Sequence, residues 1–253
     1  MLNIIDNNCS SKLIPKYDGD IEADIAKIKT VKQAKAIVGG LSNPSKMPGF
    51  AYNLPASECK KGAKLVLVPG SVCHGCYCAD TIEWTKRKNA AAGGKWRLTR
   101  YTINTVKKAL ARRHESLSDP LWVPAMAFLI KWYAKKGNLY FRWHDSGDIQ
   151  DRNHFDNIVA VARYTGEVKQ WLPTREYSFI HTDVPDNLIL RLSAHMVNQK
   201  PIKTDLPTST VSTTALPILD QRCPATEDGS DGKCGDCRNC WDSTIKNIDY
   251  RKH

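Results

Sequence analysis

A run of cysteines near the carboxyl terminus constrains this chain more than any other feature of its sequence. Cys223 is followed by a proline, and the evenly spaced pattern Cys-x2-Cys-x2-Cys follows at Cys234, Cys237 and Cys240. Three thiolates at this spacing can wrap three corners of a [4Fe–4S] cluster in one tight loop, and Cys223 can supply the fourth. The same four residues can instead hold one structural zinc ion. Either alternative predicts a Cys-rich metal-binding segment.

Composition restricts where such a protein works. The chain has 253 residues and nine cysteines, and an odd count without a visible signal peptide argues against a disulfide framework. The longest uninterrupted apolar stretch, residues 121–130, contains Pro124 and is too short to span a bilayer. We therefore expect a cytoplasmic protein with no membrane partner.

A second group of cysteines lies earlier in the chain. Cys59 is followed after thirteen residues by Cys73-x2-Cys76-x-Cys78, and three of these four could bind one cluster, leaving one iron open for a substrate or small cofactor. Alternatively, both groups close a single site with two cysteines from each. Cys9 stands alone in a polar stretch, and we interpret it as a non-ligand.

The spacing of apolar residues predicts an α/β fold, either a partial-barrel-like sheet or an open mixed sheet with helices. Asp151 is a suitable N-cap for a helix that Gly166 ends. Further helices are expected at residues 20–38, 80–92, 99–115 and 121–136, and strands at 64–68, 138–143, 168–172, 188–197 and 209–213. We expect a core domain over residues 1–219, which includes the first cysteine loop (59–78), and a Cys-rich segment over 220–253 packed on it.

Polar side chains follow two of the predicted strands. His144, Asp145 and Asp148 come directly after strand 138–143, and Arg175 follows the next strand. Because ligands bind at the carboxyl ends of strands in α/β proteins, these four are candidate catalytic residues. The alternative is a tight turn in which Asp145 caps local amides. Arg142, inside the strand pattern, is expected to pair with one of the acids.

One basic segment supplies almost the whole net charge of +11. Residues 84–113 contain ten Lys or Arg and no Asp or Glu, with Trp84, Trp96 and Tyr101 interleaved. Such a segment can bind nucleic acid or another polyanion, or it can be a solvated helix face. The candidate nucleic-acid-binding residues are Lys86, Arg87, Lys88, Lys95, Arg97 and Arg100.

Several short motifs occur in an order that resembles the phage gene-product-88 family. They are Asn53-Leu54-Pro55, then Cys59, then Cys73-His74-Gly75-Cys76-Tyr77, then Arg142-Trp143-His144-Asp145-Ser146-Gly147-Asp148, and finally Pro173-Thr174-Arg175. The resemblance covers residues 50–240 and implies a phage or mobile-element protein of the host cytoplasm. The cysteine loop is also reminiscent of radical S-adenosylmethionine enzymes. It departs from their Cys-x3-Cys-x2-Cys spacing, and it lacks their Gly-Gly-Glu motif.

Two hypotheses from different classes follow. The first is an iron–sulfur protein with one or two [4Fe–4S] clusters, acting as a redox or radical-type enzyme on a polar substrate, with S-adenosylmethionine as a further candidate cofactor. The second is a nucleic-acid-binding protein whose cysteines hold zinc or another metal only to support the fold. Both use the same candidate metal ligands: Cys59, Cys73, Cys76, Cys78, Cys223, Cys234, Cys237 and Cys240.

Overall fold

A parallel β-sheet organises the chain. The structure, a computed structural model, describes residues 13–74, 76, 78, 99–213 and 221–252. Within these residues the sheet has seven strands in the order β1-β2-β3-β4-β5-β7-β6, and every pair of neighbours is parallel. The strands are β1 (Phe50–Tyr52), β2 (Tyr140–Trp143), β3 (Lys169–Thr174), β4 (Leu188–Ser193), β5 (Thr208–Ser212), β6 (Gln221–Arg222) and β7 (Asn247–Arg251). The predicted α/β class is confirmed, and the sheet is parallel rather than mixed.

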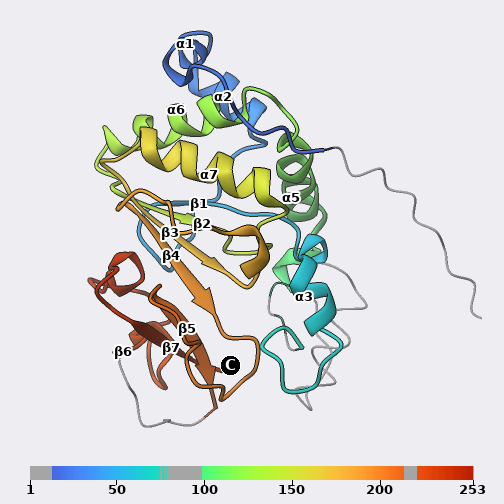
Figure 1. The fold of residues 1–253 in the computed structure, drawn as a ribbon, viewed down its shortest axis with the longest axis vertical. Coiled ribbons are helices and arrows are strands. Elements are labelled where there is room, and N and C mark those ends of the chain that lie inside the picture. Colours follow the sequence, from blue (N-terminus) through green and yellow to red (C-terminus); the bar gives the residue numbers. More distant parts are fainter. Residues whose placement is uncertain (1–12, 75, 77, 79–98, 214–220, 253) are drawn as a thin grey trace, which may run out of the picture.

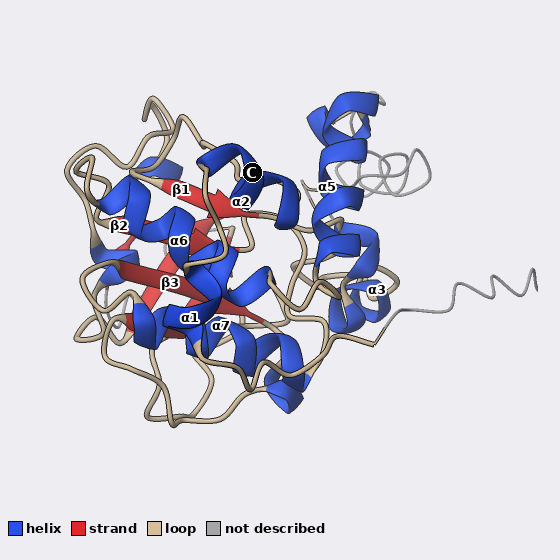
Figure 2. Cartoon of the chain, turned by 90° about the horizontal axis from the view of Figure 1, so that it is seen from above, coloured by secondary structure: helices blue, strands red, loops and turns tan. Residues whose placement is uncertain are grey.

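Helices cover one face of this sheet and one of its ends (Figures 1 and 2). The face is covered by α1 (Ile21–Ile25), α2 (Val31–Ile37), α6 (Trp122–Ala134) and α7 (Arg152–Tyr164), whereas α3 (Lys60–Leu65) and α5 (Asn104–Ser116) lie beyond the carboxyl ends of the strands. No helix in the described residues is both long and apolar enough to cross a membrane.

The main core lies between the sheet and these covering helices. Side chains alternate along a strand, so Phe141 and Trp143 of β2 and Leu172 of β3 all face the helices and are at most 2% exposed. In α7 the side chain of Asp151 accepts a hydrogen bond from the His154 amide at 2.7 Å, as the sequence predicts for an N-cap. The apolar face of that helix is buried against the sheet.

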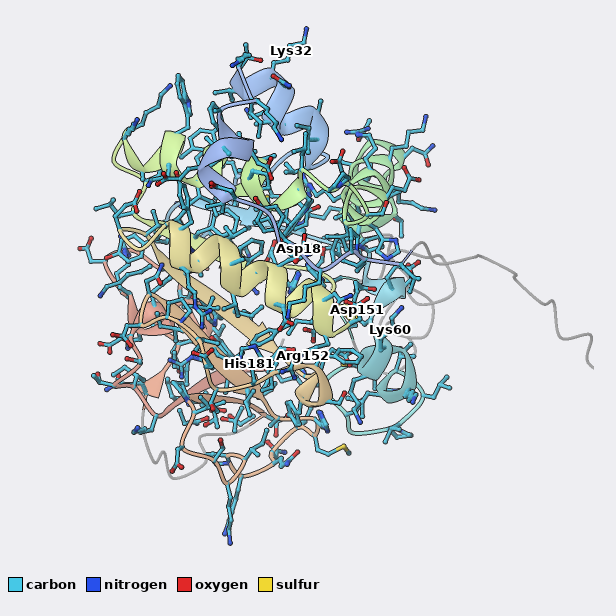
Figure 3. The ribbon with its side chains drawn as sticks, turned by 45° about the horizontal axis from the view of Figure 1, so that its top comes forward. Asp18, Lys32, Lys60, Asp151, Arg152 and His181 are labelled. Carbon is cyan, nitrogen blue, oxygen red and sulfur yellow. The ribbon has the colours of Figure 1, made fainter. Side chains whose placement is uncertain are left out.

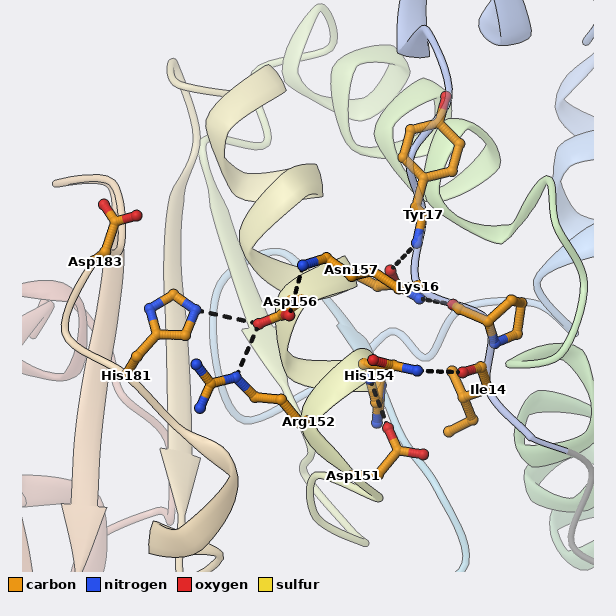
Figure 4. A network of polar contacts seen from close by, with 12 residues as sticks. Ile14, Lys16, Tyr17, Asp151, Arg152, His154, Asp156, Asn157, His181 and Asp183 are labelled. Atoms are coloured by element: carbon orange, nitrogen blue, oxygen red, sulfur yellow. Dashed lines mark hydrogen bonds and ion pairs between the residues drawn. The ribbon is translucent and has the colours of Figure 1, made fainter.

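Polar side chains of α7 also fix the start of the described chain (Figure 4). Asn153 donates to the carbonyl of Ile14 at 2.9 Å, and Asn157 donates to the carbonyl of Pro15 at 2.9 Å. The Tyr17 amide donates back to Asn157 at 2.8 Å. These three bonds hold residues 14–17 against α7.

The C-terminal segment packs on the opposite face of the sheet. Trp241 makes edge contacts with the rings of Tyr140 and Trp171, and its indole N–H donates to the Phe141 carbonyl at 2.8 Å. Arg191 of β4 is fully buried, and its guanidinium donates to four backbone carbonyls, those of Thr208, Asn239, Asp242 and Ile245. Residues 221–252 also contribute β6 and β7 to the same sheet.

Several sequence predictions need correction. Residues 64–68 are not a strand, because Lys64 and Leu65 end α3, whose Lys, Ala and Leu residues favour helix. The helix expected at 20–38 is two helices, since Thr30 caps α2 and interrupts the pattern. The strand expected at 188–197 ends at Ser193. Strands β1, β6 and β7 were not predicted, and the helix expected at 80–92 lies outside the described residues.

We predict that Arg191→Leu lowers the free energy of unfolding by about 3 kcal/mol or more, because it leaves several buried carbonyls without a donor. Urea denaturation measures this, with Arg163→Ala as the control. Arg163 forms a surface ion pair with Asp183, and its loss should cost at most about 1 kcal/mol. Equal stability of the two variants would contradict the anchoring role of Arg191.

Candidate functional site

The loops that follow β1 and β2 are joined by hydrogen bonds at the carboxyl edge of the sheet. The Leu54 amide donates to the Ser146 carbonyl at 3.0 Å, and the Ser146 hydroxyl donates to the Leu54 carbonyl at 2.8 Å. Asn53 accepts from the Asp145 amide at 2.8 Å. Gly147 has φ +77°, and a Cβ there would lie 2.6 Å from that of Leu54, so glycine alone allows this approach.

Asp148 extends this junction to β3. It is 6% exposed, and its carboxylate accepts from the Ile149 amide at 2.8 Å, the Thr174 hydroxyl at 2.7 Å and the Arg175 amide at 2.9 Å. Burial raises the pKa of Asp148, and these hydrogen bonds oppose the rise. Asp148 therefore fixes the ends of β2 and β3 relative to each other.

Glu176 holds the first cysteine loop against the same edge. Glu176 is 3% exposed. Its carboxylate accepts a hydrogen bond at 2.5 Å from the backbone amide of Lys61, in the first turn of α3. The N-cap of that helix is Cys59, whose side chain makes no capping bond. Burial raises the pKa of Glu176, and the bond from Lys61 opposes the rise. A carboxylate that follows β3 thus caps the helix whose N-cap residue is Cys59.

Three thiols of the first cysteine group lie together beside Asp148. Burial raises the pKa of the Cys59 thiol well above its usual value, and the charges of Asp148, Cys76 and Cys73 add to the rise. Burial raises the pKa of Cys73 to about 11, although the nearby guanidinium of Arg175 opposes this rise. A Cβ at Gly62 would lie 3.5 and 3.8 Å from the sulfurs of Cys59 and Cys73, so both sulfurs lie beside this glycine.

Arg175 is held beside these thiols from two directions. Its Nε–H donates to the Ala194 carbonyl at the end of β4 at 3.2 Å, and its own amide is bonded to Asp148. His195 lies 3.4 Å from the Arg175 carbonyl and stacks on Tyr177 at 4.7 Å between ring centroids. The cysteine loop also meets this strand end, since the Val72 amide donates to the His195 carbonyl at 2.9 Å.

Cys78 is placed differently from the other three. It is 5% exposed and packs with Ala56, Tyr101 and Leu110 in a small apolar cluster. Its thiol donates to the backbone carbonyl of Asp145 at 3.3 Å.

Asp145 is held by two arginines. Arg142 of β2 lies 3.1 Å from one carboxylate oxygen, which confirms the expected ion pair, and Arg100 lies 3.2 Å from the other. Arg142 also lies over the Trp171 ring, on the face that the C-terminal segment covers. Asp145 therefore joins β2 to the segment at Arg100, which precedes α5.

His144 lies in the core rather than on an open rim. It is 4% exposed, and its ring is 5.4 Å from the ring of His154, which is fully buried. Within the described residues neither nitrogen of His144 has a hydrogen-bond partner. Burial lowers the pKa of His144 to about 3 and holds that of His154 well below its usual value.

The C-terminal cysteine group, Cys223, Cys234, Cys237 and Cys240, lies on the other face of the sheet. Burial raises the pKa of Cys234, and the charges of Cys223 and Cys237 add to the rise, whereas Arg142 and Arg238 oppose it. Burial likewise raises the pKa of Cys240 to about 12, opposed by a hydrogen bond with Tyr250 at 3.3 Å. The structure therefore brings the members of this group together.

No three His, Cys, Asp or Glu side chains within residues 13–74, 76, 78, 99–213 and 221–252 are placed to hold a single metal ion. Of the candidate nucleic-acid-binding residues, Arg100 is described and forms the ion pair with Asp145. The others, Lys86, Arg87, Lys88, Lys95 and Arg97, lie outside the described residues.

Sequence reasoning did not identify Asn53, Lys61 or Thr174 as parts of the site. Asn53 and Thr174 stand at strand ends, which is a usable signal. The Lys61 amide is a backbone group whose partner is 115 residues away, so no local pattern could have indicated it.

We predict that stability falls as the pH falls below 6.5. The unfolded chain takes up protons there that the buried rings of His144 and His154 do not, and this uptake favours unfolding. For His144 the loss between pH 6.5 and about 5 is about 2 kcal/mol. Urea titrations of wild type and His144→Asn measure it, since asparagine tolerates the φ of +57°. Parallel pH profiles for the two proteins would contradict the account.

Comparison with known proteins agrees with the order of motifs at these strand ends. The model of the family described as gene product 88 matches residues 22–243, which include both cysteine groups and every described strand end of the site. No curated protein and no solved structure matches the chain. The resemblance seen in the sequence is confirmed, and the chain belongs to the gene product 88 family.

Proposed function

We propose that this chain binds an iron–sulfur cluster through Cys59, Cys73 and Cys76 and uses it in redox or radical chemistry on a polar substrate. One observation carries the proposal. Three thiols of the loop after β1 gather at the carboxyl edge of a parallel sheet, next to Asp148 and Arg175 from the ends of the following strands. That edge is where α/β proteins bind their ligands.

The residues present fit such a group. Thiolates are the ligands that iron–sulfur clusters take, and the sulfurs of Cys59 and Cys73 lie together beside Gly62. A cluster held by three thiolates would supply one-electron chemistry and one iron corner open to a small molecule. The cysteine loop is reminiscent of radical S-adenosylmethionine enzymes, and this likeness implies S-adenosylmethionine as the small molecule for the open iron.

The surrounding side chains would have distinct tasks. Glu176 fixes the first turn of α3 and with it the backbone of Cys59. Asp148 fixes the loop that precedes α7 against the end of β3. Arg175 presents a guanidinium beside the thiols and can bind an anionic group of a substrate through two parallel hydrogen bonds. Its Nε–H is already anchored to Ala194, so the group is held in one orientation.

The C-terminal cysteine group would hold a second metal centre. Arg142 and Arg238 oppose the rise in the pKa of Cys234, and Arg191 and Arg142 oppose the rise in the pKa of Cys240. These arginines would offset the negative charge of four thiolates. Four thiolates are the donor set that either a [4Fe–4S] cluster or a structural zinc ion takes.

Metal analysis of anaerobically purified protein tests the proposal. We expect about four iron and four sulfide per chain at the first site and, if the second centre is a cluster, about eight in total. Cys73→Ala should remove the iron and sulfide of the first site, and Cys237→Ala should leave them in place. Cys9→Ala is the control and should change neither.

Zinc as the only metal, in a colourless protein, would contradict the iron–sulfur proposal. Iron lost equally from Cys73→Ala and Cys237→Ala would contradict the assignment of the two groups to separate sites. Reductive cleavage of S-adenosylmethionine by the reduced protein tests the radical form of the chemistry.

A second candidate function is binding of nucleic acid. The observation that favours it is a basic surface at the same end of the molecule. Glu58, next to Cys59, lies 3.9 Å from His114 of α5, which places the start of the cysteine loop against that helix. Exposed basic side chains lie on both helices. They are Lys60 (labelled in Figure 3) and Lys64 on α3, and Lys107, Lys108 and Arg112 on α5.

We predict that replacing Lys107 and Lys108 together by Ala weakens binding of single-stranded DNA or RNA and lowers the salt slope of log K by about 1 to 2. Lys32→Ala together with Lys35→Ala, on helix α2, is the matched control. Fluorescence anisotropy between 50 and about 200 mM salt measures both effects. No binding by wild-type protein at low salt would exclude this function.

A further inference from the structure

We infer that Cys78 is not a metal ligand but a positioning residue whose thiol donates a hydrogen bond to the ligand Cys76. The inference rests on the proposed iron–sulfur site and assigns a role to the fourth cysteine of its loop. On this inference, the sulfur of Cys76 is bound to iron, and the thiol of Cys78 donates a hydrogen bond to that sulfur.

The surroundings of Cys78 are those of a core residue. Its side chain is 5% exposed, and its neighbours are Ala56 from the loop after β1 together with Tyr101 and Leu110 from the region of α5. Cys59, Cys73 and Cys76 are each less buried than Cys78. The Cys78 sulfur is enclosed within this small cluster, whereas the sulfurs of Cys59 and Cys73 lie beside Gly62.

The thiol of Cys78 already has hydrogen-bond acceptors. It donates to the Asp145 carbonyl at 3.3 Å, and it is also hydrogen-bonded to Cys76. A thiol has one proton, so it can serve one of these acceptors at a time. Once Cys76 binds iron as a thiolate, that sulfur carries negative charge and becomes the stronger acceptor of the two.

The Asp145 carbonyl keeps Cys78 in place for this role. Asp145 is held by Asn53 through its amide and by Arg100 and Arg142 through its carboxylate. Its carbonyl therefore has a fixed position next to the Cys78 sulfur. The result is a donor held within reach of one ligand sulfur by groups that take no part in ligation.

A hydrogen bond donated to a ligand thiolate stabilises added negative charge, so it favours the reduced state of a cluster. Loss of the Cys78 donor should therefore lower the midpoint potential of the first site without releasing iron. A serine at this position keeps a donor and should restore the potential in large part.

The experiment compares wild-type holoprotein with Cys78→Ala, Cys78→Val and Cys78→Ser. Iron and sulfide are counted, and the electron paramagnetic resonance signal of the reduced protein is titrated against potential. The resonance signal that disappears in Cys73→Ala is assigned to the first site. Cys78→Val is included because it fills the apolar cluster if Cys78→Ala does not fold.

We expect all three Cys78 variants to keep the iron and sulfide of wild type. The midpoint potential should fall in the alanine and valine variants and lie closer to that of wild type in the serine variant. Loss of iron from the alanine and valine variants, as in Cys73→Ala, would show that Cys78 is a ligand and overturn the inference. An unchanged potential in both would also overturn it. Wild-type protein without iron would contradict the proposed function itself, and the inference with it.

Discussion

The parallel pairing of β1 with β2, of β2 with β3 and of β3 with β4 is the constraint on which the candidate site depends. It brings the carboxyl ends of strands that are far apart in the sequence to one edge, and their loops then have to be joined there. The buried carboxylate of Asp148 makes that junction, because it accepts hydrogen bonds from both the loop after β2 and the end of β3. Without it, Arg175 would lose one of the hydrogen bonds that fix it beside the cysteine loop.

The same logic explains how the described part of the cysteine loop is held against the sheet. Glu176 caps α3 across a separation of 115 residues, and the end of β4 pairs with the loop through the Val72 amide. Both contacts come from strand ends that the sheet has already placed. Contacts with the strand ends therefore help to bring the thiols of Cys59, Cys73 and Cys76 together, in addition to the spacing of these residues in the sequence.

Sequence alone predicted the fold class and the elements with strong periodicity. α7 was predicted because its apolar residues recur at helical spacing, and Asp151 is its N-cap as expected; α6 was predicted as a more buried helix. β1 and β6 are three and two residues long, which is too short for a pattern, and β7 has the polar sequence Asn-Ile-Asp-Tyr-Arg. The Arg142–Asp145 ion pair was expected, whereas the burial of His144 beside His154 depends on a left-handed turn that no local pattern indicated.

Two cysteine groups on different sides of one sheet are the central claim of this account. Anomalous X-ray scattering at the iron edge, from crystals of the anaerobically purified protein, tests it most directly. We predict strong iron density beside Cys59, Cys73 and Cys76, and a separate metal peak beside Cys223, Cys234, Cys237 and Cys240. A single metal site shared by cysteines of both groups, or no iron beside Cys59, would contradict it.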